Sequence, residues 1–488
     1  MIFNLKDAPL DEDKHFDVCI FGSGPAGITL ALQLAEKGVK VGLFEAGSKS
    51  FTTESNDIYQ SISVGLQGWF DLMRKRFFGG TSNQWLGRCR PFEASDFERS
   101  PLVDLPGWPI TIDDIVPYQD KAMEILNLDK EIGFRPFNEG TRDKLFNPDV
   151  GLFSAPITRF GEKYGEQIRE SKNIELYLNA NLCDLTLNDT HASVVSAKLQ
   201  GYGGKSSLVQ ANSFVMAMGG IENARILLNC DSQVTKGIGN HSGFLGRCFM
   251  EHPHVIIGQY VINEGITSSN ERKDFEFYSA DKLVKEQRLT KGNFTFQKVE
   301  EIVSHGRTGE IKSFFKNLSC SLGIDEKVQF ISNFNCPGSG IIWTEFEQLP
   351  SKNSRVYLSE DKDSLGLRKA IIDWNMTKLD IDSYRRSAIQ LAKSFSDSGF
   401  GKIRLKPYIL DKEAELPIRQ HAHHMGTTRM AANESEGVVD ANCKVFGVDN
   451  LYVAGSSIFP TGGCGNPTLP IVKFALRLAD HLQSIRYQ

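Results

Sequence analysis

Three histidines stand within four positions in the segment HAHHMGTTRM, residues 421–430 of a 488-residue chain that has only ten histidines. A neutral imidazole titrates close to neutral pH, so a histidine here is a candidate general base. His421 and His423 could instead bind a metal ion from one strand face, but no third-ligand motif is obvious and we predict no metal. His424 should face the other way and pack in the fold, and Arg429 should pair with a carboxylate. A base here needs a partner elsewhere in the chain.

The amino-terminal segment 16–47 has the pattern of a dinucleotide-binding strand–helix–strand unit. The apolar run 18–21 predicts a buried parallel strand, and a helix should follow it and end at Gly38. Glycines spaced G-x-G-x-x-G permit a tight turn, approach of a pyrophosphate and close helix packing, and an acid after the second strand, 39–44, suits a ribose. The acid argues against a 2′-phosphorylated nucleotide, but the pattern fits NAD and FAD equally. The expected cofactor contacts here are Gly22, Gly24, Pro25, Ala26, Gly27, Glu45 and Ala46.

A second glycine loop lies in FFGGTSNQWLGRCRPF, residues 77–92. Its glycine pair allows a sharp backbone, and the short polar side chains that follow could lie flat against a ring. The alternative is a glycine turn pinned by a buried tryptophan. Arg88 and Arg90 could line a polar pocket, although surface positions explain them equally well. The expected cofactor contacts are Gly79, Gly80, Thr81, Ser82, Asn83 and Trp85.

The middle of the chain changes character twice. Residues 173–218 predict strands joined by turns, followed by a glycine-started helix at 219–229 that suits a cofactor edge, with Leu182 and Ala217 as further contacts. Residues 241–407 are richer in aromatic and β-type segments, such as VQFISNFNC and GIIWTEFEQL, with one helix near 381–397. We therefore expect a separate layer there.

The closing segment returns to the cofactor pattern. A strand at 451–454 precedes a turn of small residues and an amphipathic helix. Backbone amides at the start of that helix would face an anionic site, for which a flavin N1/C2 carbonyl is suitable. The expected contacts are Gly455, Ser456, Asn466, Pro467 and Thr468.

Composition excludes several functional classes. A net charge of −5 gives no positive field for nucleic acid or an anionic membrane, and no apolar stretch reaches about 18 residues. The amino terminus lacks the pattern of a secretory signal, so we expect a cytoplasmic protein with neither nucleic-acid nor membrane partners. Nine cysteines without a CxxC pair predict reduced, packed thiols.

Taken together, these stretches resemble the glucose–methanol–choline (GMC) oxidoreductases, and most closely the branch of pyranose oxidase and of sugar and glycoside oxidoreductases. The resemblance is carried by GSGPAG with FEAG, GGTSNQW, GGIENARILL, EHP at 251–253, HHMGTTRM, GVVDANCKVFGVDNLYVAGSSIFPT and GNPTLPI. It implies FAD as the cofactor and an α/β fold, α+β overall, in which a Rossmann-like FAD-binding domain is interleaved with a substrate domain on an antiparallel sheet. We predict the FAD-binding domain at 1–98, 155–240 and 408–488, and the substrate domain at 99–154 and 241–407.

The resemblance also assigns the catalytic pair. It implies that His423, three residues before Gly426, is the general base, and that Asn466 orients the substrate hydroxyl while hydride passes to flavin N5. His252 in EHP is expected to be structural or to lie at the rim of the site. Relatives in this branch attach flavin through a histidine where this chain has Gln84, so we predict dissociable FAD, and we leave the electron acceptor open between O₂ and a quinone-like compound.

The predicted reaction is oxidation of a secondary ring alcohol of a sugar, glycoside or sugar-like natural product to a ketone. The alternatives are oxidation of a primary alcohol to an aldehyde on a sugar or aminoglycoside-like substrate, and a lyase of the same fold that keeps FAD. A flavin monooxygenase should need NAD(P)H and does not predict the pairing of His423 with Asn466, and a non-catalytic FAD-binding protein is a further alternative. The oligomeric state is left open, with a homo-oligomer as one option.

Overall fold

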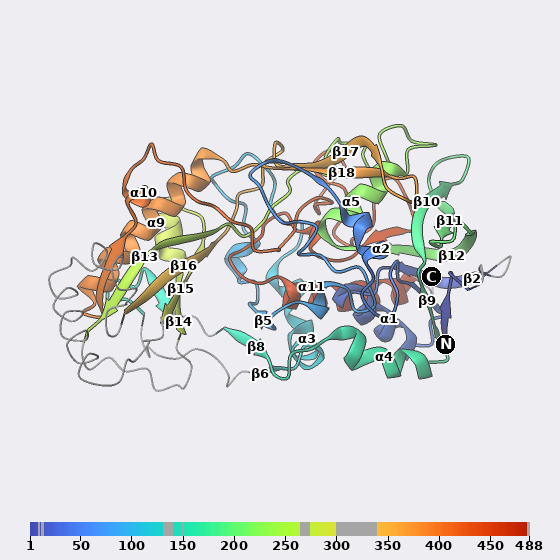
Figure 1. Cartoon of the computed structure of the whole chain (residues 1–488), viewed down its shortest axis with the longest axis horizontal. Coiled ribbons are helices and arrows are strands. Elements are labelled where there is room, and N and C mark those ends of the chain that lie inside the picture. The colour runs from blue at the N-terminus through green and yellow to red at the C-terminus, as the bar shows by residue number, and fades with distance from the viewer. Residues whose placement is uncertain are drawn as a thin grey trace.

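A computed structural model describes residues 1–7, 10, 14–129, 140–148, 151–263, 274–298 and 339–485. Two large sheets lie toward opposite ends of its long axis, and the chain passes between them more than once (Figure 1). The predicted strand segment VQFISNFNC falls outside the described residues.

The first sheet has eight strands in the order β1-β9-β3-β2-β12-β11-β10, with β20 also paired to β12. The pairs that join β1, β9, β3, β2, β12 and β20 are parallel, whereas β10, β11 and β12 pair antiparallel. Ile20, Leu43 and Val215 are fully buried in its centre, as expected for a sheet covered on both faces. The strands are β1 (Ile2–Asn4), β2 (His15–Phe21), β3 (Val41–Phe44), β9 (Ile174–Leu178), β10 (Asn181–Leu187), β11 (Val194–Gln200), β12 (Ser206–Met216) and β20 (Leu451–Val453).

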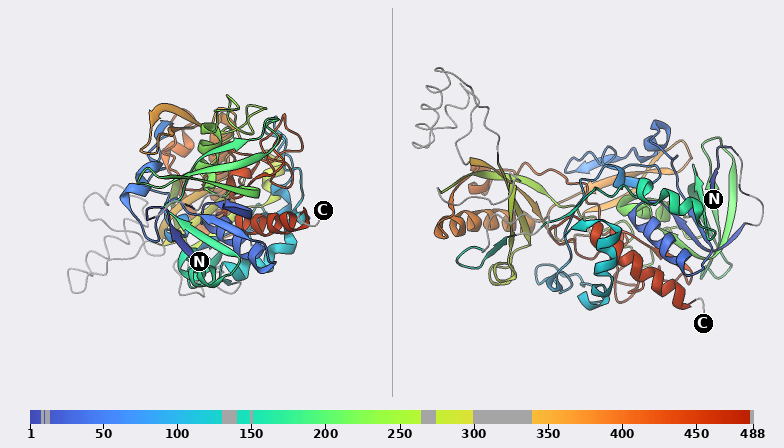
Figure 2. Two further views of the ribbon diagram at one scale, coloured as in Figure 1. Left: turned by 90° about the vertical axis from the view of Figure 1, so that its right-hand side faces the viewer. Right: turned by 90° about the horizontal axis from the view of Figure 1, so that it is seen from below.

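Helices cover both faces of this sheet. The amino-terminal helix α1 packs against the closing helix α11, with α3 and α4 nearby, whereas α5 lies on the other side (Figures 1 and 2). Gly38 follows α1 with a φ of +77°, a conformation that favours glycine at a helix end. The predicted helices after the first strand, at 219–229 and at the end of the chain are confirmed. The helices are α1 (Pro25–Glu36), α2 (Thr53–Asn56), α3 (Gln119–Ile125), α4 (Phe160–Glu170), α5 (Gly219–Asn229) and α11 (Thr468–Ile485).

The second sheet is antiparallel throughout, in the order β19-β13-β16-β15-β14-β7. The long helix α9 packs against it through aromatic contacts, including a stacked pair of Phe346 and Tyr384 with ring centroids 4.2 Å apart. The predicted antiparallel layer and the helix near 381–397 are thus confirmed. Its elements are β7 (Phe146–Pro148), β13 (His254–Ile262), β14 (Asp274–Ser279), α6 (Asp281–Gln287), β15 (Gly292–Lys298), β16 (Ser339–Phe346), α9 (Lys378–Asp397), β19 (Gly401–Leu405) and α10 (Pro407–Leu410).

Two small sheets join distant segments. β17 (Arg355–Lys362) and β18 (Arg368–Trp374) form one with β4 (Ile62–Gly65), beside α5. Residues 368–374, predicted for the substrate domain, thus pair with a segment predicted for the FAD-binding domain, and the division itself stays a prediction. The other small sheet contains β5 (Arg88–Cys89), β6 (Leu128–Asp129) and β8 (Leu152–Ser154).

The architecture confirms the predicted fold class: a Rossmann-like α/β part combined with an antiparallel second sheet. The seven cysteines in the described part are all free and buried, as expected for reduced thiols. None of the helices in the described ranges combines the length and the apolar character needed to cross a lipid bilayer.

Candidate active site

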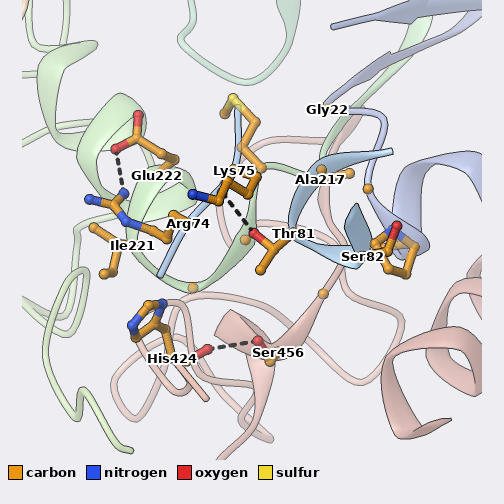
Figure 3. Close-up of a pocket in the computed structure, with 18 of the residues that line it drawn as sticks. Gly22, Arg74, Lys75, Thr81, Ser82, Ala217, Ile221, Glu222, His424 and Ser456 are labelled. Carbon is orange, nitrogen blue, oxygen red and sulfur yellow. Dashed lines mark hydrogen bonds and ion pairs between the residues drawn. The ribbon is translucent and has the colours of Figure 1, made fainter. Parts of the chain in front are cut away.

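A cavity of about 660 Å³ extends from the first glycine loop to the histidines of segment 421–424. Residues from both ends of the chain line it, so that the amino-terminal motif and the carboxy-terminal motif face the same space (Figure 3). Among the predicted site residues, those that line it are Gly22, Gly24, Pro25, Ala26, Glu45, Ala46, Gly80, Thr81, Ser82, Trp85, Leu182, Ala217, His423, Gly455, Ser456, Asn466, Pro467 and Thr468.

The first glycine loop joins β2 to α1 and has little room for side chains. A Cβ on Gly27 would lie 1.9 Å from the carbonyl oxygen of Gly22, and one on Gly22 would lie 2.5 Å from that of Ala217. A Cβ on Gly24, in contrast, would meet no protein atom within 4 Å. Gly27 itself does not line the cavity, so its role is close packing of helix and loop.

Glu45 ends β3 and braces this loop. One carboxylate oxygen accepts hydrogen bonds from the Ser23 backbone N–H at 3.1 Å and the Ser23 hydroxyl at 2.5 Å, and the other accepts from the Gly47 N–H at 2.8 Å. The side chain is 4% exposed yet still reaches the cavity wall. The glycine loop, the empty surroundings of Gly24 and this acid together fit a bound dinucleotide such as FAD.

The second glycine loop lies directly against the first. Gly80, with a φ of +57°, would place a Cβ 3.0 Å from the Cα of Gly24. Trp85 lines the cavity while its indole N–H donates to the Thr158 carbonyl at 2.8 Å. Gly79 and Asn83 do not line the cavity, and the Asn83 amide instead donates to the carbonyls of Phe78 and Gly80.

Sequence reasoning missed a set of cavity residues directly before this loop and on α5. Arg74 lies 3.2 Å from Glu222, which also pairs with Arg225 at 3.1 Å. Burial raises the pKa of Glu222, but Arg225 and Arg74 outweigh it, so the pKa lies below its usual value. The basic run RKR at 74–76 was the available signal. The missed lining residues include Tyr59, Met73, Arg74, Lys75, Arg76, Gly220, Glu222 and Gln420.

His423 and Asn466, the predicted catalytic pair, are in direct contact. The Asn466 side-chain amide nitrogen lies 2.9 Å from His423 Nε2, although the two residues are 43 positions apart. On the other side of the ring, His423 Nδ1 lies 2.9 Å from Nδ1 of His252. Burial, followed by the neighbouring His252 and His421, holds the pKa of His423 well below its usual value, so the neutral form of the imidazole is favoured.

A buried carboxylate holds the histidine segment in place. Glu251 accepts hydrogen bonds from the backbone N–H groups of His421 and His423 at 3.2 and 3.0 Å, and its other oxygen lies 3.1 Å from His424 Nε2. Ala422 between them has a φ of +63°, an unusual conformation for a residue with a Cβ. This strained turn, fixed by Glu251, points the neighbouring rings into the site.

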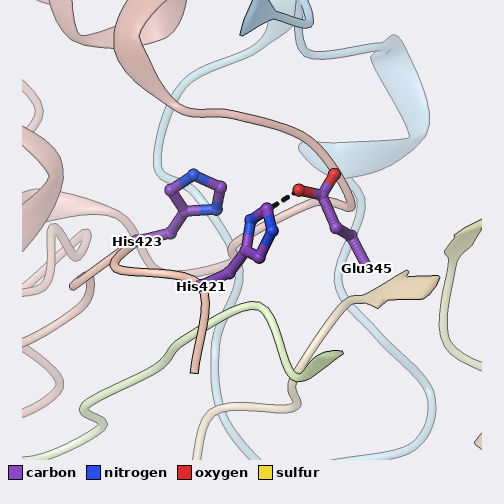
Figure 4. A group of neighbouring side chains, drawn as sticks. All are labelled: Glu345, His421 and His423. Atoms are coloured by element: carbon purple, nitrogen blue, oxygen red, sulfur yellow. Dashed lines mark ion pairs between the residues drawn. The ribbon is translucent and has the colours of Figure 1, made fainter. Parts of the chain in front are cut away.

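His421 belongs to a separate ion-pair chain. Its Nδ1 lies 2.6 Å from Glu345 (Figure 4). Arg88 lies 3.5 Å from the same carboxylate and 2.5 Å from Glu276. Burial lowers the pKa of His421, but Glu345 outweighs it and the pKa is raised. Glu345, His421 and His423 offer ligand atoms within 4.8 Å of one another, which supplies the third ligand that the sequence pattern lacked. Since Arg88 and His421 already neutralise the carboxylate, absence of a metal stays our prediction.

Three other predicted roles have clear outcomes. His424 is buried against Phe70 and pairs with Glu251, as a packed residue should. His252 is fully buried in contact with His423 and does not line the cavity. The carboxylate partner predicted for Arg429 was wrong: this fully buried side chain donates to the Pro106 carbonyl at 2.5 Å and to the sulfur of Cys248 at 3.7 Å, because backbone and sulfur surround it.

The chain is similar in sequence and in fold to several known proteins. The family model described as GMC oxidoreductase matches residues 350–475. The chain is 24% identical to 6‴-hydroxyparomomycin C oxidase of Streptomyces lividus over 98% of this chain and 94% of that protein, and 33% identical to C-glycoside 3-oxidase of Microbacterium trichothecenolyticum over 21% and 22%. The structure of pyridoxine 4-oxidase from "Mesorbium loti" has the same fold, with a TM-score of 0.58, 18% identity and coverage of 96% and 99%.

Proposed function

We propose that the chain is an FAD-dependent alcohol oxidoreductase of the GMC type, and that it oxidises a hydroxyl group of a sugar, glycoside or sugar-like natural product to a carbonyl group. The observation that carries this proposal is the contact of His423 Nε2 with Asn466 on the wall of a cavity that begins at the dinucleotide loop. A base and an amide donor at one end of a cofactor cavity are suited to an alcohol.

In the proposed reaction His423 takes the hydroxyl proton on Nε2. Bound FAD would supply the acceptor for the hydride that leaves the carbon bearing this hydroxyl. The Asn466 amide, now on Nε2, would turn to the hydroxyl oxygen and orient it as the proton departs. The residues that would hold FAD are those of the two glycine loops, Glu45 and the start of α11.

We propose a secondary ring hydroxyl, which gives a ketone, as the first candidate. The name of the C-glycoside 3-oxidase supports it, because carbon 3 of a hexopyranose carries a secondary hydroxyl. A primary hydroxyl, which gives an aldehyde, is the second candidate. The observation favouring it is that the relative matched over 98% of the chain is named for a 6‴ position, and carbon 6 of a hexopyranose carries a primary hydroxyl.

We further propose that FAD binds without a covalent bond to the second glycine loop. Gln84, at the position where related enzymes carry a histidine, lines the cavity and offers only an amide. Denaturation in acid should therefore release all the flavin into the supernatant. The electron acceptor, O₂ or a quinone-like compound, is identified by reoxidising the reduced enzyme with each.

The central experiment follows anaerobic bleaching of enzyme-bound flavin by a panel of sugars, glycosides and aminoglycosides. Bleaching by an alcohol supports oxidation and excludes the lyase, and a requirement for NAD(P)H would indicate a monooxygenase instead. His423→Ala should retain FAD and reduce it about 10² to 10⁴ times more slowly, the usual contribution of a general base. An unchanged rate of reduction would refute the assignment of His423.

A further inference from the structure

His252 is the residue on which His423 depends for its orientation, although it stands 171 positions earlier in the chain. It is fully buried just before β13, and each of its ring nitrogens has one partner. Nδ1 lies 2.9 Å from Nδ1 of His423, and Nε2 lies 3.1 Å from the carbonyl oxygen of Gly462. Gly462 is close enough that a Cβ on it would lie 3.4 Å from the same Nε2.

The Gly462 carbonyl oxygen fixes the direction of each hydrogen bond in the series that runs through His252 and His423 to Asn466. A carbonyl can only accept, so Nε2 of His252 must carry the proton. A neutral imidazole has one N–H, which leaves Nδ1 of His252 as an acceptor and requires Nδ1 of His423 to donate to it. By the same rule Nε2 of His423 carries a lone pair, and the Asn466 amide group facing it must be the NH₂.

Both rings satisfy the condition of neutrality that this reasoning requires. Burial lowers the pKa of His252, and burial together with the adjacent histidines lowers that of His423. The charged groups nearby are engaged elsewhere: Glu251 with backbone N–H groups and His424, and Glu345 with His421 and Arg88.

We propose that His252 is a positioning residue that keeps the lone pair of His423 on Nε2, the nitrogen beside Asn466 and the cavity. The inference rests on the proposed function of His423 as the base. When Nε2 takes the hydroxyl proton, the ring becomes a cation whose Nδ1–H still donates to His252. No second proton has to move, and the hydrogen bond strengthens as the charge forms.

Two substitutions of His252 separate acceptor from bulk. His252→Asn can place its side-chain oxygen near the position of Nδ1 and continue to accept from His423, whereas His252→Leu fills the space without an acceptor. With Leu, His423 is free to carry its proton on Nε2, and the Asn466 amide can turn to match. A histidine base in the wrong tautomer loses up to about 10⁴ in rate, so partial loss of control should cost about 10 to 10².

The test compares flavin content, the rate of anaerobic flavin reduction and the ¹⁵N shifts of labelled histidines in both variants. We expect normal flavin content in each, reduction about 10 to 10² times slower with Leu, and largely restored with Asn. The ¹⁵N signals of His423 are assigned by their absence from the spectrum of His423→Ala. In the wild type they should show that the proton is on Nδ1. A proton on Nε2 of wild-type His423, or a wild-type rate of flavin reduction in His252→Leu, overturns the inference. If His423→Ala also reduces flavin normally, the proposed function fails; if only His252→Leu does, the inference alone fails.

Discussion

The end of the cavity at the first glycine loop presents mostly backbone, whereas the end at the histidines presents buried ionisable side chains that hold one another in place. The loop end depends on glycines, because a Cβ on Gly27 would lie only 1.9 Å from a carbonyl oxygen. The histidine end is held by polar partners, since Glu251 accepts hydrogen bonds from the turn and the Gly462 carbonyl contacts His252, the proposed positioning residue for His423. Substitutions should therefore affect binding at one end and chemistry at the other.

The largest effect is expected at Glu251, which bears the charge that the histidine turn is built around. Glu251→Ala leaves the backbone N–H groups of His252, His421 and His423 without their buried acceptor and His424 without its partner. This change should cost about 3 to 5 kcal/mol of unfolding free energy. Glu251→Gln retains an oxygen acceptor and should cost about 1 to 3 kcal/mol. Urea unfolding measures both, and flavin reduction should slow in parallel.

Equal stability of the two Glu251 variants would contradict this account, because it would mean that the oxygen acceptor retained by glutamine contributes nothing. A suitable control is Glu166→Gln, an exposed position on α4 that pairs with Arg169 at the surface. It should change stability by no more than about 1 kcal/mol.

The two ends also differ in how far sequence predicts them. The strands beside the glycine loop, α1 and the acid after β3 follow from local spacing, since each element is formed by neighbours in the chain. Glu251, His252 and Glu345 carry no such signal, because only the tertiary fold brings them to the histidine turn. His252, for example, is 171 positions from His423.

Arg429 also shows that sequence alone does not predict the tertiary partners of a buried side chain. Its charge predicts a carboxylate partner, but the fold surrounds it with a carbonyl and a sulfur. The pairing of His423 with Asn466 was accessible only through family resemblance, since no spacing rule brings positions 43 apart together.

A pair of glycine substitutions tests whether the loop end is shaped by the protein or by its cofactor. Gly27→Ala drives a Cβ into the Gly22 carbonyl and should lower both the stability of flavin-free protein and its FAD affinity, by about 1 to 3 kcal/mol. Gly24→Ala meets no protein atom, so flavin-free protein should keep its stability while FAD affinity falls about ten-fold or more, because the methyl enters the space predicted for the cofactor. FAD titration and thermal unfolding measure both; unchanged FAD affinity in Gly24→Ala would place the cofactor elsewhere.

The smallest effect sharpens the contrast inside the histidine end, where His421 and His423 stand two residues apart with pKa shifts of opposite direction. Glu345 raises the pKa of His421 above its usual 6.5, so its contribution to stability is complete below about pH 6.5 and is lost as pH rises through the folded value. The pKa of His423 is lowered, so its contribution is present above about pH 6.5 and is lost as pH falls. The stability difference between wild type and His421→Asn should therefore shrink as pH rises above about 6.5, and that for His423→Asn should shrink as pH falls below about 6.5. Since His421 is 30% exposed, we expect less than about 1 kcal/mol from its pair. Urea unfolding midpoints measured on both sides of pH 6.5 test this prediction. If the stability difference from wild type changed with pH in the same direction for both variants, the two imidazoles would not have opposite pKa shifts.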